Sequence, residues 1–82
     1  MPAASLTDVL LPARANGRAV MGALVLGWED AEAYVAAAEE VGCPVILQAG
    51  HKFRETLPVA ISGLMFRTLG EAASVPVVAH VD

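Results

Sequence analysis

Val75-Pro-Val-Val-Ala-His80-Val-Asp82 is the stretch that decides the fold, because it combines the composition of a buried β-strand with two ionisable side chains at its end. Side chains alternate between the two faces of a strand, so Val78, His80 and Asp82 fall on one face. An ionisable group in an apolar setting is costly, and parallel α/β folds keep their functional groups at the carboxyl ends of strands. The stretch therefore predicts a strand whose end contributes to a site.

The residues before this strand alternate between segments typical of strands and of helices. Apolar runs rich in branched residues predict strands at residues 18–26 and 44–48. Helical spacing predicts one helix from residue 29 to its cap at Gly42, and another after a polar loop at residues 50–55, with Thr56 as its cap and Pro58 in its first turn. The buried faces are expected to be Ala31, Tyr34, Val35, Ala38 and Val41 in the first helix, and Ile61, Leu64, Met65, Leu69 and Ala72 or Ala73 in the second.

A short helix is expected ahead of the first strand. Ser5 and Asp8 have the spacing of a capping box, and Asn16-Gly17 ends the helical pattern. Pro12 is expected to kink or break this helix, because proline lacks the backbone donor and crowds the preceding turn. The lone Cys43 is predicted to be a buried, unreactive thiol, since it starts an apolar run and has no activating neighbours.

The order is thus a leading helix followed by β-α-β-α-β. Crossover connections of this length predict right-handed units and a parallel sheet within a single domain over residues 1–82, with no internal boundary. Parallel strands end on one edge, which gathers the side chains that could form a site. We expect that edge to carry Gln48, Gly50, His80 and Asp82.

Composition excludes several classes of protein. A net charge of −4 with five basic residues among 82 argues against nucleic acid and against an anionic membrane surface as partners. The amino terminus has no signal-peptide pattern and the longest apolar stretch, residues 19–28, is too short to span a bilayer, so the expected location is cytoplasmic. Hydrophobic residues make up 56% of the chain, more than a small monomer hides, so we expect an oligomer or another form of association.

The chain resembles the amino-terminal third of a zinc-dependent class II ketose-bisphosphate aldolase, the fructose- and tagatose-bisphosphate aldolase family. Four stretches carry the resemblance from end to end: Ser5-Leu-Thr-Asp-Val-Leu10, Gly27-Trp-Glu-Asp-Ala31, Glu39-Glu-Val-Gly-Cys-Pro-Val-Ile-Leu-Gln48 and the stretch quoted first. The resemblance implies a (β/α)8 TIM barrel, a phosphorylated ketose as substrate and zinc as Lewis acid in an aldol cleavage of carbohydrate metabolism such as glycolysis.

By resemblance, Asp82 is the catalytic acid/base that takes or returns the proton of the substrate hydroxyl, and His80, Gln48 and Gly50 shape the site around it. The family's zinc-binding histidines fall outside this segment, so we expect this chain alone to bind no metal. His51 is more simply a solvent-facing loop residue than a ligand, because no constellation of partners is apparent. The chain departs from the family pattern at two points: Leu24 and Leu26 lie where many members carry asparagine, and Gly50 replaces a serine.

Simpler structural roles stay open for each of these residues. Asp82 could end a strand in water, His80 could be a hydrogen-bonded core imidazole, and Gln48 could satisfy backbone groups. Two functions follow. The chain is either part of a class II aldolase, completed by the remainder of the barrel and inactive alone, or a non-catalytic small βα module that folds by association with a second copy.

Overall fold

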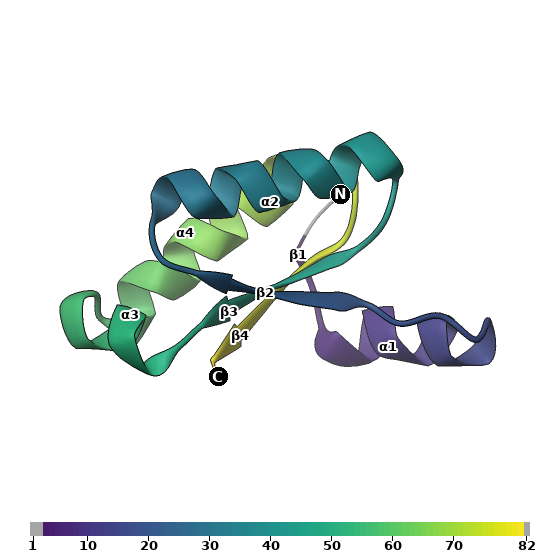
Figure 1. Cartoon of the computed structure of the whole chain (residues 1–82), viewed down its shortest axis with the longest axis horizontal. Helices are drawn as coiled ribbons and strands as arrows, with labels where there is room; N and C mark the ends of the chain where they lie inside the picture. Colours follow the sequence, from purple (N-terminus) through teal and green to yellow (C-terminus); the bar gives the residue numbers. More distant parts are fainter. Residues whose placement is uncertain (1–2, 82) are drawn as a thin grey trace.

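The computed structural model describes residues 3–81, which form a four-stranded sheet and four helices (Figure 1). In chain order the elements are β1 (Ala3–Ala4), α1 (Leu6–Ala15), β2 (Met21–Val25), α2 (Trp28–Val41), β3 (Val45–Ala49), α3 (His51–Thr56), α4 (Val59–Ala72) and β4 (Val77–Val81). No helix in this described part is long and apolar enough to cross a membrane.

All strands of the sheet are parallel, in the order β1-β4-β3-β2. The three longer strands are neighbours in the same order as in the sequence, which is the arrangement that successive βα units give in a barrel. The α/β class, the parallel sheet and the partial TIM-barrel architecture are therefore confirmed. The additional strand β1 was not predicted, and it pairs only with the first two residues of β4, Val77 and Val78.

The sheet has helices on both faces. In Figure 1, α2 and α4 lie together on one face, and α1 lies on the other, near the amino ends of the strands. The larger core lies under α2 and α4 and includes Val25, Leu47 and Val77, each at most 1% exposed. A smaller core of Val9, Ile46 and Val78 lies under α1. We call the face opposite α2 and α4 the inner face, because a closed barrel keeps the helices that connect its strands on the outside. Helix α1 precedes these connections and lies on the inner side, near the amino ends of the strands (Figure 1).

The capping box of α1 forms as predicted. The Asp8 backbone N–H donates to Ser5 Oγ and the Ser5 N–H donates to Asp8 Oδ2, both at 3.1 Å. The expected break at Pro12 is wrong, because the helix continues through it to Ala15. The Asn16 side chain donates to the Pro12 carbonyl at 2.8 Å and so supports this last turn from beyond the helix.

Helix α2 follows its predicted limits, and Gly42 closes it in the left-handed conformation with φ 71°. Ala31, Val35 and Ala38 are buried and Tyr34 packs half-buried against them. Val41 is 70% exposed, so its predicted burial is wrong. Cys43 is exposed as well, contrary to the prediction of a buried thiol, because it follows the helix cap rather than lying within the strand.

Residues 51–56 form a helix, α3, where a polar loop was predicted. Phe53 explains the difference: it is 7% exposed and stacks on Phe66 of α4, with ring centroids 6.4 Å apart. Burying this one aromatic ring fixes the turn against the domain. Thr56 ends α3 by donating to the Phe53 carbonyl rather than capping the next helix, and α4 starts after Pro58.

The buried face of α4 is rotated from the prediction. Ser62, Phe66 and Gly70 face the core, while Ile61 and Leu64 are 50% and 62% exposed; Met65 and Leu69 are partly buried. A buried Ser62 is tolerated because its hydroxyl donates to the Val59 carbonyl at 3.1 Å.

Candidate functional site at the carboxyl edge of the sheet

The carboxyl ends of β2, β3 and β4 meet at one edge of the sheet, as parallel strands require. Register aligns Leu24 with Gln48, and Gln48 with His80, so that the three residues form a row across the sheet. Paired residues of parallel strands share a face, and this row shares the inner face with Ile46 and Val78. The structure therefore places Gln48 and His80 in neighbouring strands, as the sequence predicted.

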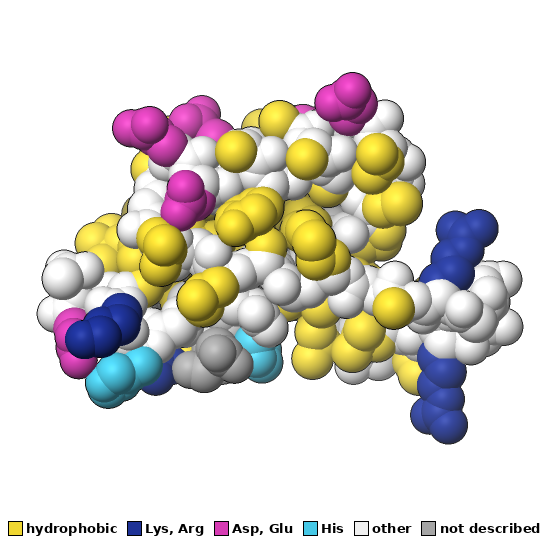
Figure 2. All heavy atoms as spheres, in the orientation of Figure 1, with side chains coloured by type: hydrophobic (Ala, Val, Ile, Leu, Met, Phe, Trp, Pro, Cys, Tyr) yellow, Lys and Arg dark blue, Asp and Glu magenta, His cyan; other side chains and the backbone are white. Residues whose placement is uncertain are grey.

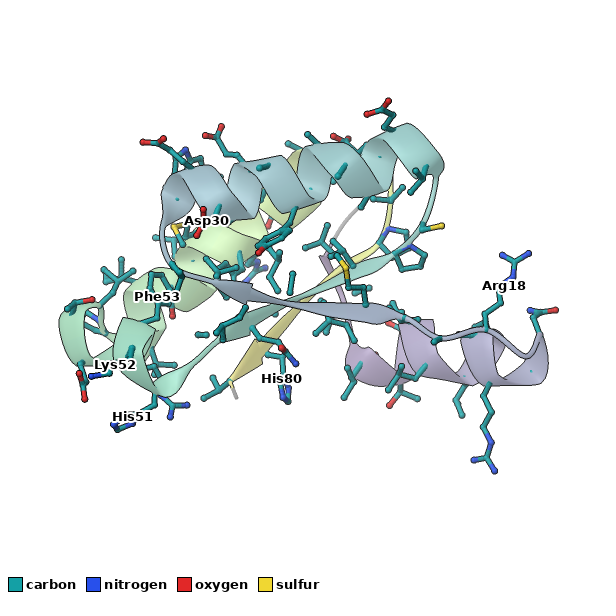
Figure 3. The ribbon with its side chains drawn as sticks, viewed as in Figure 1. Arg18, Asp30, His51, Lys52, Phe53 and His80 are labelled. Carbon is teal, nitrogen blue, oxygen red and sulfur yellow. The ribbon has the colours of Figure 1, made fainter. Side chains whose placement is uncertain are left out.

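His80 is half-buried, and its side chain points away from α2 and α4 in Figure 3. Its ring makes no hydrogen bond with the part of the chain that is described, so the alternative of a hydrogen-bonded core imidazole finds no support there. An imidazole with both nitrogens available can donate, accept or relay a proton at neutral pH. His80 is thus chemically free to act at this edge.

The carboxamide of Gln48 is displaced from the row along the inner face, toward the amino end of β2. A Cβ built on Gly22 would lie 2.7 Å from Gln48 Nε2 and 3.0 Å from Cδ, so the amide rests directly over Gly22, toward the amino end of β2. Gln48 makes no side-chain hydrogen bond within residues 3–81. The role of satisfying backbone groups is therefore not the one that this conformation performs.

Gly50 and Leu24 meet at the edge itself. A Cβ built on Gly50 would lie 2.7 Å from Leu24 Cδ1, which shows that Leu24 fills the space that a side chain at position 50 would need. Gly50 thus leaves room at the edge for the Leu24 side chain. Asp82, the predicted acid/base, lies outside the described residues; it directly follows Val81, the last residue of β4.

Ligands for a metal do not gather in the described part of the chain. Across residues 3–81, no three His, Cys, Asp or Glu side chains come together in a way that could hold an ion. His51 lies on exposed α3, where its Nε2 is 3.1 Å from Glu55 Oε1, and is separate from His80 in Figure 3. Residues 3–81 alone therefore do not form the zinc site that the family resemblance implies.

The charges around the edge are of both signs. Helix α3, which directly follows β3, carries His51, Lys52, Arg54 and Glu55. The first turn of α2 follows β2 and carries Glu29 and Asp30, and the Asp30 carboxylate accepts the Leu26 N–H at 3.2 Å; Figure 2 shows the acidic side chains mainly over α2. A cavity of about 640 Å³ is not part of this site, because it is lined by Met21, Val45 and Pro76 near the amino ends of the strands.

Sequence reasoning missed Gly22 as a residue of this site. In the sequence it only interrupts an apolar run, although glycine inside a strand often marks the close approach of another group. That group, the Gln48 carboxamide, comes from a different strand, so only the register of β2 on β3 reveals it.

Successive βα units, a parallel sheet and an available imidazole at the carboxyl edge define a partial βα-barrel of the kind that carries enzyme active sites. The model of the family described as fructose-bisphosphate aldolase class-II matches residues 4–82, and the chain belongs to that family. No curated protein matches the chain.

Proposed function

We propose that this chain is the amino-terminal part of a class II aldolase, acting in the reversible aldol cleavage of a ketose bisphosphate to dihydroxyacetone phosphate and an aldehyde. Family membership over residues 4–82 supports the reaction class. The observation that carries the proposal is the register of β3 on β4, which aligns Gln48 with His80 and directs β4 toward the edge where Asp82 follows. This is where βα-barrels bind substrates.

Asp82 is the proton carrier of the proposed mechanism. In the cleavage direction its carboxylate accepts the proton of the substrate hydroxyl on the carbon that becomes the aldehyde. The carbon–carbon bond then breaks, its electron pair passes toward the ketose carbonyl, and the enediolate so formed takes up a proton to give dihydroxyacetone phosphate. In the condensation direction the same carboxyl group returns that proton. Positioned acid/base groups of this kind contribute about 10²- to 10⁴-fold to a rate. His80, two residues earlier in the chain, is proposed to orient the carboxylate or the substrate.

The rest of the barrel is the proposed partner of this chain. One apolar flank runs along β2, where Met21 and Leu26 are 58% and 69% exposed, and Figure 2 shows hydrophobic side chains gathered between α2 and α1. Another lies on α4, where Ile61 and Leu64 are exposed. A closed barrel would cover both flanks with neighbouring βα units, whereas a two-fold dimer through either one would leave the other in water.

The second candidate is the non-catalytic βα module that associates with its own copies. The same exposed flanks favour it, since they would drive association whether or not the chain has an active site. Intact mass separates the two. A cellular species near 8.5 kDa without zinc would support the module, and a much heavier polypeptide would support the aldolase. In either case we propose a cytoplasmic location.

A graft tests the proposed activity directly. Residues 4–82 would replace the corresponding segment of a full-length class II aldolase, and cleavage of fructose and tagatose bisphosphates would be assayed with zinc present. We expect turnover of at least one ketose bisphosphate by the graft and none by the 82-residue chain alone. A folded graft without activity on any ketose bisphosphate would contradict the proposal, as would turnover by the isolated chain.

A further inference from the structure

Two glycines on the inner face seat two side chains that lean in opposite directions along the sheet. Gln48 and Leu24 are register partners, yet the Gln48 carboxamide lies over Gly22, two residues toward the amino end of β2. Leu24 lies over Gly50, two residues toward the carboxyl end of its neighbouring chain segment. The two long side chains therefore pass each other, each above a position without a side chain.

Space, and not backbone conformation, is what these two glycines provide. Neither has a positive φ: the positive-φ glycines among the described residues are Gly17 and Gly42, and Gly50 has φ −80°. Any larger residue could adopt these backbone angles. At either position, however, a Cβ would approach the seated side chain to 2.7 Å, closer than carbon contacts allow.

The opposite lean decides which side chain faces the carboxyl edge between β2 and β3. The amide, the only polar group of the pair, is withdrawn toward the amino end, while Leu24 extends toward the edge and is 48% exposed. Leu26, one step further along, is 69% exposed. This part of the edge, which we call the leucine sector (Leu24 and Leu26), presents apolar side chains although a glutamine lies beside it. The Asp30 carboxylate borders the sector, where it accepts the Leu26 N–H at 3.2 Å.

We propose that Gly22 and Gly50 are positioning residues that keep the leucine sector apolar, so that it selects a phosphorylated substrate presenting an apolar group there instead of a hydroxyl. This inference rests on the proposed function, because it takes the carboxyl edge as the place where substrate binds. It goes further by assigning the polarity of one subsite. His80, on the other side of Gln48, is left as the polar group of the row.

Nuclear magnetic resonance tests the seating without any assay of activity. In the unmodified chain we expect nuclear Overhauser contacts from the Gln48 side-chain amide to the Gly22 α-protons, and from the Leu24 methyls to the Gly50 α-protons. Gly22→Ala should shift the Gln48 amide signals and Gly50→Ser the Leu24 methyl signals. Gly63→Ala is the matched control, since a Cβ there meets nothing within 4 Å. Absence of both contacts in the unmodified chain would overturn the seating, whether or not the variants fold.

Two probes with the same three-carbon chain and the same charge, which differ in two hydroxyl groups, test the subsite. Propyl phosphate and glycerol 1-phosphate would be titrated into the chain while the Leu24 methyl signals are followed. We expect propyl phosphate to bind about 3-fold more tightly or better, a modest part of what a buried apolar pocket achieves. Leu24→Asn should abolish that preference, whereas Leu11→Asn, at another exposed leucine on α1, should preserve it.

Equal or tighter binding of glycerol 1-phosphate by the unmodified chain would overturn the assignment of an apolar subsite while leaving the proposed function intact. If neither probe shifts any signal at the carboxyl edge, the apolar subsite is contradicted, whereas the proposed function, which needs the rest of the barrel, is decided separately by the graft. The contacts at Gly22 and Gly50 still decide the seating in that case.

Discussion

At the scale of single residues, Ser5 and Asp8 show how a local motif is read directly from sequence. The Ser5 backbone N–H and then its side chain hydrogen-bond to Asp8, and they hold the pKa of that carboxyl below its ordinary value of 3.8. Because the folded pKa is lowered, the carboxylate form stabilises the folded state above the ordinary value. That contribution is lost as pH falls through the lowered pKa.

Ser5→Ala should therefore lower the free energy of unfolding by about 1 kcal/mol at neutral pH, as other helix caps do. The difference from the unmodified chain should shrink between about pH 5 and about pH 2, as Asp8 becomes protonated. Thermal unfolding followed by circular dichroism across that range measures it. Glu40→Gln, at an exposed position of α2, serves as the control. A loss that stays constant down to the lowest pH would contradict the role given to Asp8.

Some residues of the site could be predicted and others could not. Strand alternation alone places Val78 and His80 on one face, and the structure agrees. The lean of Gln48 could not be predicted, because it depends on a glycine in another strand. The prediction that Cys43 is buried was wrong, because a thiol beside an apolar run is usually buried, while here its position after the helix cap leaves it exposed.

At the scale of elements, α2 is tied to the segment before β4 by one long-range contact. Glu39 Oε2 accepts the Ser74 backbone N–H at 2.8 Å, although the two residues are 35 positions apart. The contact lies near the end of α2 and just ahead of the strand that carries His80. It therefore helps to set where β4 begins.

Glu39→Ala should lower the free energy of unfolding by roughly 1 kcal/mol, since the hydrogen bond is charge-assisted but exposed. Hydrogen exchange of the Ser74 amide should rise by more than that of the β3 amides, which the contact does not involve. Urea unfolding and exchange rates measure both effects, with Glu40→Ala as the neighbouring control. Equal exchange at Ser74 in the two variants would rule out the tie.

The errors in predicting elements share one physical cause, which is tertiary contact. Residues 51–56 are helical because the Phe53 ring stacks on Phe66, and neither the composition nor the spacing of this segment reveals that contact. The buried face of α4 differs from the predicted one because Ser62 is buried, with its hydroxyl hydrogen-bonded within the helix. A polar residue in this helix therefore does not mark the exposed face. The long α2, which ends at the predicted Gly42 cap, was predicted well.

At the scale of the whole molecule, the surface is larger than that of a typical monomer. The chain exposes 5085 Å², against about 4,650 Å² expected for a globular monomer of this mass. The excess is apolar in part, because leucine, valine, methionine and isoleucine side chains lie open on the flanks of β2 and α4. Strand β1 is two residues long and pairs only with the first two residues of β4. A pairing that short has no signal in a sequence.

The isolated chain should therefore self-associate, with an apparent mass that rises with concentration in light scattering coupled to size exclusion. Leu26→Lys places a charge on the β2 flank and should lower the associated fraction at least several-fold. Arg14→Lys, on α1, should leave it unchanged. A chain that stays monomeric at every concentration would contradict the prediction that these flanks need covering.

The most direct test of the account is the turnover of the full-barrel graft with Asp82→Asn, measured beside the graft with Glu40→Gln. If the carboxyl edge of this chain carries the proton transfer, Asp82→Asn should lower kcat by about 10²- to 10⁴-fold while Glu40→Gln leaves it unchanged. An Asp82→Asn graft that keeps its kcat within about threefold, outside the range of acid/base catalysis, would contradict the account.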